Sequence, residues 1–459
     1  MNVVRRPSWM VAAIAVAVCL PYAHGEVGDP VNVTAADVLS LAFVLVMVLL
    51  VATGARPWPR VALALAAVPV AVAGLTTVLS TDPAASLPGY VRFLQVFVLL
   101  PLAVLAAVRD RRDVLIAGGG VVAASVLEAL VGIGQAITRT GASYQGRNVR
   151  AVGTFGAADV MAMATVVSFG LVITLAFLVT LRGSRRVTVV TGLVLVVQVV
   201  ALAVSLSRGT WIAAGIAVGV LLLVRDRRTA LLGGVVAVLA GVLVFGLGVG
   251  DRLVGARMRS IASSATSPDQ SVSDRYGLWR SAGAMLRDHP LTGVGPRNFA
   301  SYRDTYAPLN LSSGSDTADP VHGYVRRELR SPHNQYLLVA SEQGLAGLLG
   351  FVGVLAVLIG GLVRHRAARD PLWTVSIAFV CWLLVDFCYS DLGGPASVLV
   401  AIMLGLAARA ALPARPVERA CVGGADSGRA PEPGGSVRAR VAGDDAPVPA
   451  AAWGGRREG

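Results

Sequence analysis

The sequence predicts an all-α polytopic membrane protein with about twelve transmembrane helices and one large, partly helical outer loop. Hydrophobic residues make up 55% of the 459 residues and charged residues only 15%, against about 25% charged residues in a typical soluble domain. Apolar runs of about 18 residues or more recur along the chain. These runs are continuous and not alternating, which favours helices over transmembrane strands.

The apolar runs divide the chain into four parts. Residues 1–249 hold nine predicted helices, residues 250–341 form the large loop, and residues 342–412 hold three more helices. The tail 413–459 is rich in Pro, Gly and Ala, so we expect it to be disordered. The expected spans are 9–23, 35–53, 60–80, 89–108, 113–138, 158–181, 187–206, 209–224, 229–249, 342–363, 371–390 and 393–412.

Arginine in alternate short loops predicts the orientation of these spans. The sequence has a net charge of +13, and every residue counted as Lys or Arg is Arg. Arg residues gather in the loops near 5–6, 56–60, 109–112, 182–186, 225–228 and 364–369, whereas 24–34, 81–88 and 391–395 hold none. Cytoplasmic loops retain positive charge, so we expect both termini in the cytoplasm and the chain in a bacterial plasma membrane, among membrane lipids.

The same charge pattern argues against other classes of function. The basic excess follows the expected topology, and no nucleic-acid-binding module is recognisable. The four Cys residues show no spacing typical of a zinc site, so no metal ligands are predicted. The chain is therefore expected to work without nucleic acid and without a bound metal.

Four Arg residues break the charge rule on the predicted outer face. Arg139, Arg147 and Arg150 lie in one outer loop, and Arg208 lies in a tight outer turn between two spans. Topology disfavours Arg in short translocated loops, whereas a guanidinium binds phosphate oxygens in a bidentate manner. A single such Arg can also extend to a lipid headgroup. As a set, these residues favour an anion-binding site.

The large outer loop carries local helix signals. A cap-like pair, Ser271 and Asp274, precedes residues spaced as one helical face, namely Tyr276, Trp279, Gly283 and Leu286. Asn298 and Asn334 are suited to cap two further helices, and Gly344 stands at the entrance of the next span, where a small residue permits close packing. A structureless loop of this length is unusual, so we expect it to fold or to cover a site.

Four short motifs lie on the predicted outer side of the chain. They are Ser207-Arg208-Gly209, Asp274-Arg275-Tyr276-x-x-Trp279, Pro290-Leu291-x-Gly293-x-Gly295-x-x-x-Phe299, and His333-Asn334-x-Tyr336-Leu337 with Glu342-x-Gly344-x-x-Gly347. In the order and placement of these motifs, and in its long loop before the last three spans, the chain resembles the O-antigen ligase and O-antigen polymerase family.

The resemblance implies a metal-independent glycosyltransferase of the GT-C type that uses no cofactor. The donor would be a glycan on a polyprenyl diphosphate, and the acceptor a hydroxyl of a lipid, a glycan or a protein. In the family, the residues that match Arg208 and Arg275 are associated with the donor diphosphate, and the residue that matches His333 with activation of the acceptor. Basic residues also occur in the family near the positions of Arg147 and Arg150, which we include as donor-binding candidates.

The residue types suit this chemistry. Fixed guanidinium groups neutralise a leaving diphosphate without a metal, and a His near neutrality is suited to act as a general base. The motifs do not separate a ligase that moves a finished glycan from a polymerase that joins repeat units, or from an O-linked protein glycosyltransferase.

A transporter or flippase of lipid-linked glycans is the alternative from another class. It would predict internal repeats and broken helices at the bilayer midplane, and no clear repeat is present. Glu128 and Asp386 lie inside predicted spans, and the sequence assigns neither a role. The sugar, the acceptor and the oligomeric state are likewise not encoded in any recognisable motif.

Overall fold

The computed structural model describes most of the chain outside the tail. The described residues are 6–21, 33–55, 58–144, 147–156, 159–180, 183–226, 228, 270–308, 311, 317–319, 323–325, 330–367 and 370–412. The predicted span 229–249 and the predicted tail 413–459 lie outside these residues.

Apolar helices dominate the described residues. Eight helices are long and apolar enough to cross a membrane, by length and composition. They are α2 (Ala35–Ala52), α3 (Arg60–Val78), the continuous α4 (Pro83–Leu94), η2 (Gln95–Leu99, a π-helix) and α5 (Leu100–Ala107), α6 (Arg111–Thr138), α7 (Ala162–Thr180), α8 (Arg185–Val204), α9 (Arg208–Arg225) and α14 (Gln335–Arg364).

Three further apolar helices are shorter. They are α1 (Ser8–Ala17), α15 (Pro371–Asp386) and α16 (Ala396–Ala411). Each of the eleven regions corresponds to one predicted span, with ends that differ by several residues in places. The all-α polytopic membrane fold predicted from the sequence is confirmed.

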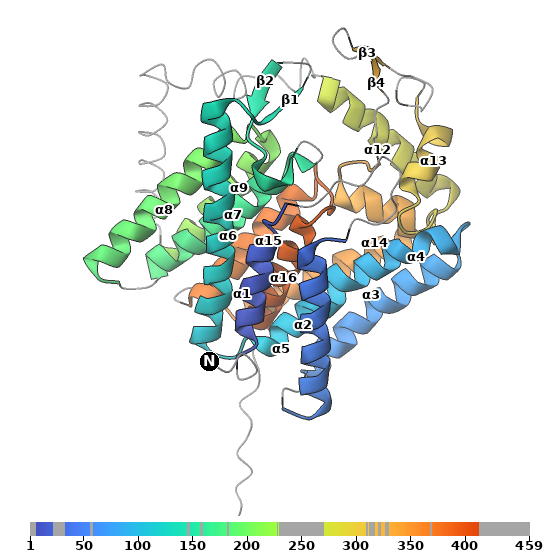
Figure 1. The fold of residues 1–459 in the computed structure, drawn as a ribbon. Coiled ribbons are helices and arrows are strands. Elements are labelled where there is room, and N and C mark those ends of the chain that lie inside the picture. Colours follow the sequence, from blue (N-terminus) through green and yellow to red (C-terminus); the bar gives the residue numbers. More distant parts are fainter. Residues whose placement is uncertain are drawn as a thin grey trace, which may run out of the picture. The chain divides into compact units, whose positions relative to one another are not determined.

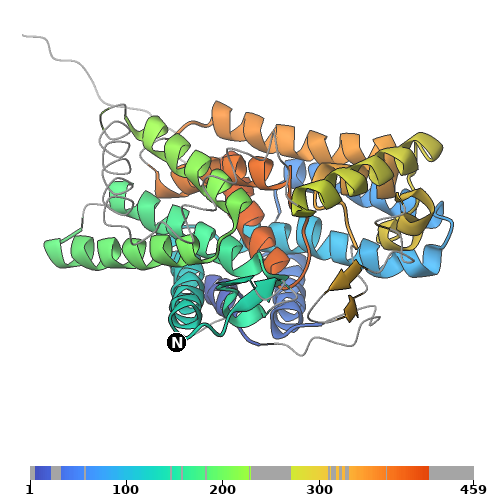
Figure 2. The same cartoon turned by 90° about the horizontal axis from the view of Figure 1, so that it is seen from above.

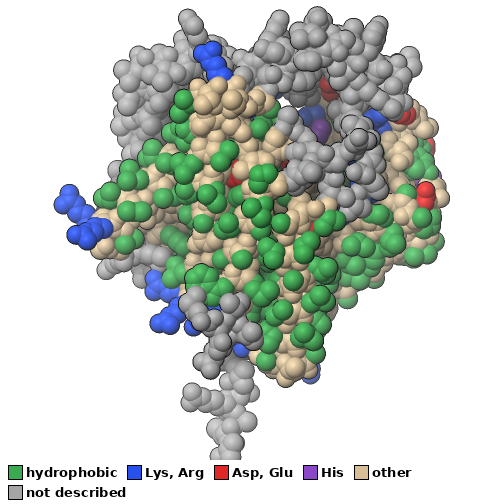
Figure 3. Space-filling model, in the orientation of Figure 1, with side chains coloured by type: hydrophobic (Ala, Val, Ile, Leu, Met, Phe, Trp, Pro, Cys, Tyr) green, Lys and Arg blue, Asp and Glu red, His purple; other side chains and the backbone are tan. Residues whose placement is uncertain are grey.

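The arrangement of side chains suits helices surrounded by lipid. Large apolar side chains stay exposed along α2, α3 and α8, and Figure 3 shows them covering the flanks of the helices. α16, in contrast, is buried along most of its length, and it packs against α5, α14 and α15. α1 packs against both α2 and α6, as Figure 1 shows. The hydrophobic core therefore lies where these packed helices contact one another.

Polar residues at the helix ends satisfy the first backbone N–H groups of several helices. Thr34 and Asp37 form a reciprocal capping box at α2, and Asp110 and Asp113 form another at α6. The Asn334 side chain caps α14 by accepting from the Leu337 backbone N–H at 3.0 Å. The Asn334 cap predicted from the sequence is thus confirmed.

Several Arg residues link the helix ends that the charge pattern assigned to one side. The Arg6 guanidinium lies 3.0 Å from the Asp110 carboxylate, which joins the start of α1 to the start of α6. Arg109 donates to the Ala55 carbonyl at 3.0 Å, after the end of α2. Arg409, near the end of α16, donates to the Val108 carbonyl at 2.9 Å. Because Val108 follows α5, the ends of α1, α2, α5, α6 and α16 lie together, as the alternating topology requires.

The described part of the large loop folds over a small core of its own. α12 (Gln270–Asp288) packs against α13 (Phe299–Tyr306) and lies beside α14 in Figure 2. Its buried hydrophobic residues are Leu278, Ala282 and Met285, whereas Tyr276 is 47% exposed. The face predicted from the aromatic residues is thus wrong. The buried face consists of smaller residues, which allow α12 to approach the turn around Val294 closely.

The chain also forms two short antiparallel hairpins among the described residues. β1 (Ala142–Tyr144) pairs with β2 (Arg147–Arg150), and Ala142 lies opposite Arg150 in that register. β3 (Thr317–Asp319) pairs with β4 (Gly323–Val325). The first hairpin places Arg147 and Arg150 directly after α6.

A backbone pairing fixes the loop onto α14. The Val294 and Gly295 N–H groups donate to the carbonyls of Ser341 and Glu342 at 2.9 and 2.8 Å. α14 is kinked at Gly344, whose φ of 64° and ψ of −165° are open essentially to glycine alone. The pairing therefore joins two of the sequence motifs through their backbones.

Candidate active site

The segment that joins α15 to α16 is the centre of the candidate site. The Gln335 backbone N–H, in the first turn of α14, donates to the carbonyls of Phe387 and Ser390 at 2.9 and 3.0 Å. The Gln335 side-chain oxygen accepts from the Leu392 N–H at 2.9 Å. Asn334 donates to the Cys388 carbonyl at 2.8 Å. The residues after His333 thus hold residues 387–392 in place.

His333 lies beside a carboxylate from this segment. Its Nδ1 atom is 3.4 Å from the Asp391 Oδ1 atom, and the His333 side chain is 42% exposed. The Ser331 hydroxyl donates to the same Asp391 oxygen at 2.8 Å. His333 has a φ of 49°, in the left-handed region that costs a non-glycine residue about 1–2 kcal/mol. A carboxylate against Nδ1 leaves Nε2 as the nitrogen that can face a substrate.

Gly209, the residue after Arg208, contacts the same segment, residues 387–392. Arg208 is the first residue of α9, and the carbonyl of Gly209 accepts a hydrogen bond from the Tyr389 hydroxyl. A Cβ atom on Gly209 would clash with the Tyr389 ring. Leu206, two residues before Arg208, has a φ of 51° and turns the chain between α8 and α9. The Ser-Arg-Gly motif therefore serves close packing against Tyr389 and places Arg208 near it.

Arg275 lies on α12, near enough to this segment for an electrostatic interaction. Its positive charge acts on Asp386 and on Tyr389. α12 is held close to His333 because the Trp279 indole N–H donates to the Pro332 carbonyl at 2.9 Å. The backbone next to Arg208, the charge of Arg275 and the side chain of His333 thus come together around residues 386–391.

The remaining two candidates lie on the β1–β2 hairpin. Arg150 donates from Nη2 to the Val160 carbonyl at 3.1 Å. The next residue, Ala151, donates from its backbone N–H to the Val204 carbonyl at 3.1 Å, which links the hairpin to the end of α8. Arg147 begins β2, and its side chain lies outside the described part of the structure. The structure therefore places Arg150 near the Arg208 turn and leaves Arg147 as a prediction.

Glu128, which the sequence left without a role, holds the segment after β2. Its carboxylate accepts from the Thr154 backbone N–H at 3.0 Å and from the Thr154 hydroxyl at 2.6 Å. Gln135, two turns further along α6, accepts from the N–H groups of Val152 and Gly153 at 2.9 Å each. Both side chains replace the water that this backbone would lack inside a membrane. Glu128 is a structural anchor of the hairpin.

Asp386 ends α15 at the border of the site. Its side chain is 4% exposed, and its Oδ1 atom has no hydrogen-bond partner among the described residues. The charges of Arg275 and Asp391 both act on it. An oxygen in this position can accept a hydrogen bond from a substrate hydroxyl or balance the charge of Arg275.

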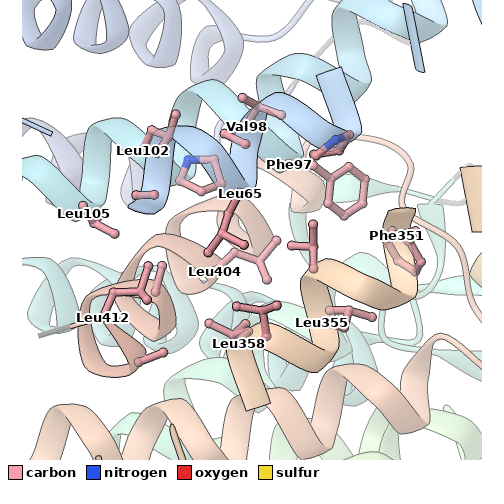
Figure 4. Close-up of a pocket in the computed structure, with 18 of the residues that line it drawn as sticks. Leu65, Phe97, Val98, Leu102, Leu105, Phe351, Leu355, Leu358, Leu404 and Leu412 are labelled. Atoms are coloured by element: carbon pink, nitrogen blue, oxygen red, sulfur yellow. The ribbon is translucent and has the colours of Figure 1, made fainter. Parts of the chain in front are cut away.

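An apolar groove between the membrane helices runs from Phe351 toward the opposite helix ends, where Leu105 and Leu412 line it. α3, α4, η2, α5, α14 and α16 line it. Figure 4 shows leucine side chains and the Phe97 and Phe351 rings around it. The Phe351 ring lies 5.7 Å from Phe387 and 6.2 Å from Tyr336, centroid to centroid. Aromatic rings thus connect the groove with the residues that follow His333.

The site contains two residues that sequence reasoning missed, Asp391 and Tyr389. Figure 3 shows a histidine and basic side chains within a hollow near one end of the molecule. Asp391 stands in a short Ser-Asp-Leu-Gly-Gly turn between two apolar spans, which reads as an ordinary polar turn. In the sequence, the one feature that could have indicated Asp391 is that it is an acidic residue in a short outer loop, on the same predicted side as His333.

Fold and site together define a polytopic membrane protein with a polar site of Arg, His and Asp at one end of its helices. Residues 193–352 match the family model described as O-antigen ligase, a region that includes Arg208, Arg275 and His333. This matched region supports the O-antigen ligase family that the motifs indicated. No curated protein sequence matches the chain.

Proposed function

We propose that this chain is a glycosyltransferase of cell-surface polysaccharide biosynthesis. It transfers a glycan from a polyprenyl diphosphate to an acceptor hydroxyl at the extracytoplasmic face of the membrane. The observation that carries the proposal is the approach of the Arg208 turn, the Arg275 charge and the His333 side chain to residues 386–391. A base and two cations near one another are suited to displacement of a diphosphate from a sugar.

The proposed reaction is a direct displacement. The Nε2 atom of His333 takes the proton of the acceptor hydroxyl while that oxygen attacks the anomeric carbon from the face opposite the diphosphate. The bond from the anomeric carbon to the diphosphate oxygen breaks, and its electron pair leaves with the polyprenyl diphosphate. Arg208 and Arg275 stabilise the charge on the leaving group, and Asp391 stabilises the protonated His333. General-base catalysis contributes roughly 10²–10⁴-fold.

The apolar groove supports a lipid-linked donor. A polyprenyl chain is a long apolar ligand, and the lining of the groove is formed by leucine, phenylalanine, valine, alanine and proline. Phe351 lines the groove and also contacts Phe387, which lies next to Asp386. A donor with its lipid in the groove would therefore have its head group beside the Arg residues.

A transfer assay with purified protein in lipid tests the proposal. Wild type, His333→Ala and Arg275→Ala are given a glycan on polyprenyl diphosphate and an acceptor, with EDTA present. We expect transfer by wild type, with inverted configuration of the linkage by NMR, and a loss of at least roughly 10²-fold in both variants. Two matched controls, His289→Ala and Arg280→Ala, lie on the same helix region as Arg275 and should keep activity.

The outcomes separate the alternatives. Transfer to a finished acceptor supports a ligase, and growth of the donor glycan by repeat units supports a polymerase. If wild type consumes no donor with any acceptor, while labelled lipid-linked glycan crosses the bilayer, the transferase proposal fails and a flippase takes its place.

A further inference from the structure

An ion pair inside the apolar helices has no part in the proposed reaction. Arg92 of α4 and Asp37 of α2 form a salt bridge, in which the Asp37 side chain is 12% exposed. Both residues belong to helices apolar enough to cross a membrane. Charged groups in such helices are costly, and where they occur they commonly serve a function. We therefore expect this ion pair to have a structural or functional role.

The pair belongs to a closed set of hydrogen bonds. Asp37 accepts from the Thr34 backbone N–H at 3.0 Å and from the Thr34 hydroxyl at 2.8 Å. Gln95 donates to Asp37 at 3.0 Å and to the Ser40 hydroxyl at 2.8 Å, and its own oxygen accepts from Arg92 at 2.7 Å. These bonds fix one side of the Arg92 guanidinium.

The other side of the guanidinium reaches the loop that carries Asp391. The Arg92 Nη2 atom donates to the Gly394 carbonyl at 2.8 Å and to the Ser397 hydroxyl at 2.6 Å. Both terminal nitrogens of Arg92 are thus engaged by protein oxygens, which argues against Arg92 as a ligand of the donor diphosphate. Its geometry is that of a clamp between α2 and the start of α16.

Asp391 lies between two anchors. On one side, Gln335 binds Ser390 and Leu392 through backbone and side-chain hydrogen bonds. On the other side, Arg92 binds Gly394, whose φ of 58° is in the left-handed region and sets the direction of the carbonyl. The position of Asp391 against His333 therefore depends on both anchors.

We propose that Arg92 is a positioning residue, which fixes the loop between α15 and α16 so that Asp391 faces His333. Asp37 neutralises and orients the Arg92 guanidinium for this task. The proposal rests on the proposed function for its effect on catalysis, whereas the effect on the loop itself is independent of that function.

Arg92→Lys tests the clamp. A lysine keeps the charge opposite Asp37 but lacks the planar fork that reaches Gly394 and Ser397 at the same time. We expect kcat for transfer to fall about 10- to 100-fold, from the loss of charge-assisted hydrogen bonds, with an unchanged KM for the donor and near wild-type thermal unfolding. Arg409→Lys is the matched control, because Arg409 also binds a backbone carbonyl, but at the opposite helix ends.

A second readout does not depend on transfer. Cys388 is exposed in the same loop, and its rate of alkylation by a small maleimide, followed by peptide mass spectrometry, reports the position of that loop. A faster rate in Arg92→Lys than in wild type and Arg409→Lys, together with the lower kcat, supports the proposal. An unchanged alkylation rate overturns it, and so does a defect confined to the donor KM. If wild type shows no transfer at all, the proposed function fails, and the alkylation rate alone decides whether the clamp exists.

Discussion

His333 has a left-handed backbone conformation, which persists only where the surrounding contacts hold it in place. Its φ of 49° is unfavourable for a residue with a side chain, and such residues cluster at active sites. Ser331 and Asp391 surround it on the Nδ1 side. The strain and the carboxylate together fix which nitrogen faces the hollow. The activity of His333 is therefore expected to depend on Asp391.

Asp391→Asn should lower kcat for transfer about 10- to 100-fold, because a hydrogen bond to a charged group is worth about 1.5–3 kcal/mol. The double variant His333→Ala with Asp391→Asn should be no slower than His333→Ala alone, since both residues act as one unit. Asp304→Asn, which changes an acid of α13 that pairs with Arg303, is the matched control. Wild-type rates in Asp391→Asn would exclude Asp391 as the partner of His333.

Residues in recognisable motifs could be predicted from the sequence. Residues whose proposed role depends on contacts formed in the fold could not. Arg208, Arg275 and His333 stand in recognisable motifs, so they could be proposed from the sequence. Asp391 and Arg92 could not be identified, because one lies in an ordinary turn and the other inside an apolar run. Their roles arise only when loop and helices come together.

At the scale of elements, the kinked α14 joins the loop motifs to the membrane helices. A Cβ atom on Gly344 would clash with the backbone of Leu291, and one on Gly293 would clash with the backbone of Glu342. Glu342 in turn accepts from the Phe299 N–H at 3.1 Å, at the start of α13. The kink of α14 at Gly344, the turn at Gly293 and the start of α13 are thus packed directly against one another.

Gly344→Ala should destabilise the protein by about 1–3 kcal/mol from backbone strain alone, and it should also reduce transfer. Gly353→Ala, in a helical part of the same α14 with open space around it, should be neutral or stabilise by up to about 1 kcal/mol. Thermal unfolding in detergent, followed by circular dichroism, measures both variants. Equal stability of the two would show that the kink at Gly344 carries no strain against a side chain.

The sequence predicted the positions of the helices better than it predicted the contacts between them and the loop. Apolar runs and caps such as Asn334 placed the helices, because both depend on local residues. The pairing of residues 294–295 with 341–342 depends on backbone groups. Any residue supplies those groups, so the sequence pattern did not reveal this pairing.

At the scale of the whole molecule, the helix ends fall into two groups. Arg6, Arg109 and Arg409 link ends at one side, and the site with His333 and Cys388 lies at ends of the other group. The orientation across the membrane remains the prediction made from the Arg-rich loops. It places the site outside the cell.

A maleimide that cannot cross membranes should label Cys388 in intact cells, because Cys388 is exposed in the outer loop. Cys388→Ser should remove the label, since Cys19 is buried and Cys381 is half-buried, and Cys421 lies in the tail that we expect inside. Adding Thr53→Cys to Cys388→Ser, at the opposite helix ends, should give a label only after permeabilisation. Labelling of Thr53→Cys in intact cells would reverse the predicted orientation.

The backbone pairing between the outer turn and the kink of α14 has a consequence for the divergence of related sequences. Its geometry is specified by glycines and by N–H and carbonyl groups, so the side chains between the glycines are free to change without loss of the contact. Sequences with this arrangement are expected to drift far in overall identity and still keep the intervals between Gly293, Gly295 and Gly344 within their segments. Spacing, more than residue similarity, is then the signature by which distant relatives can be recognised.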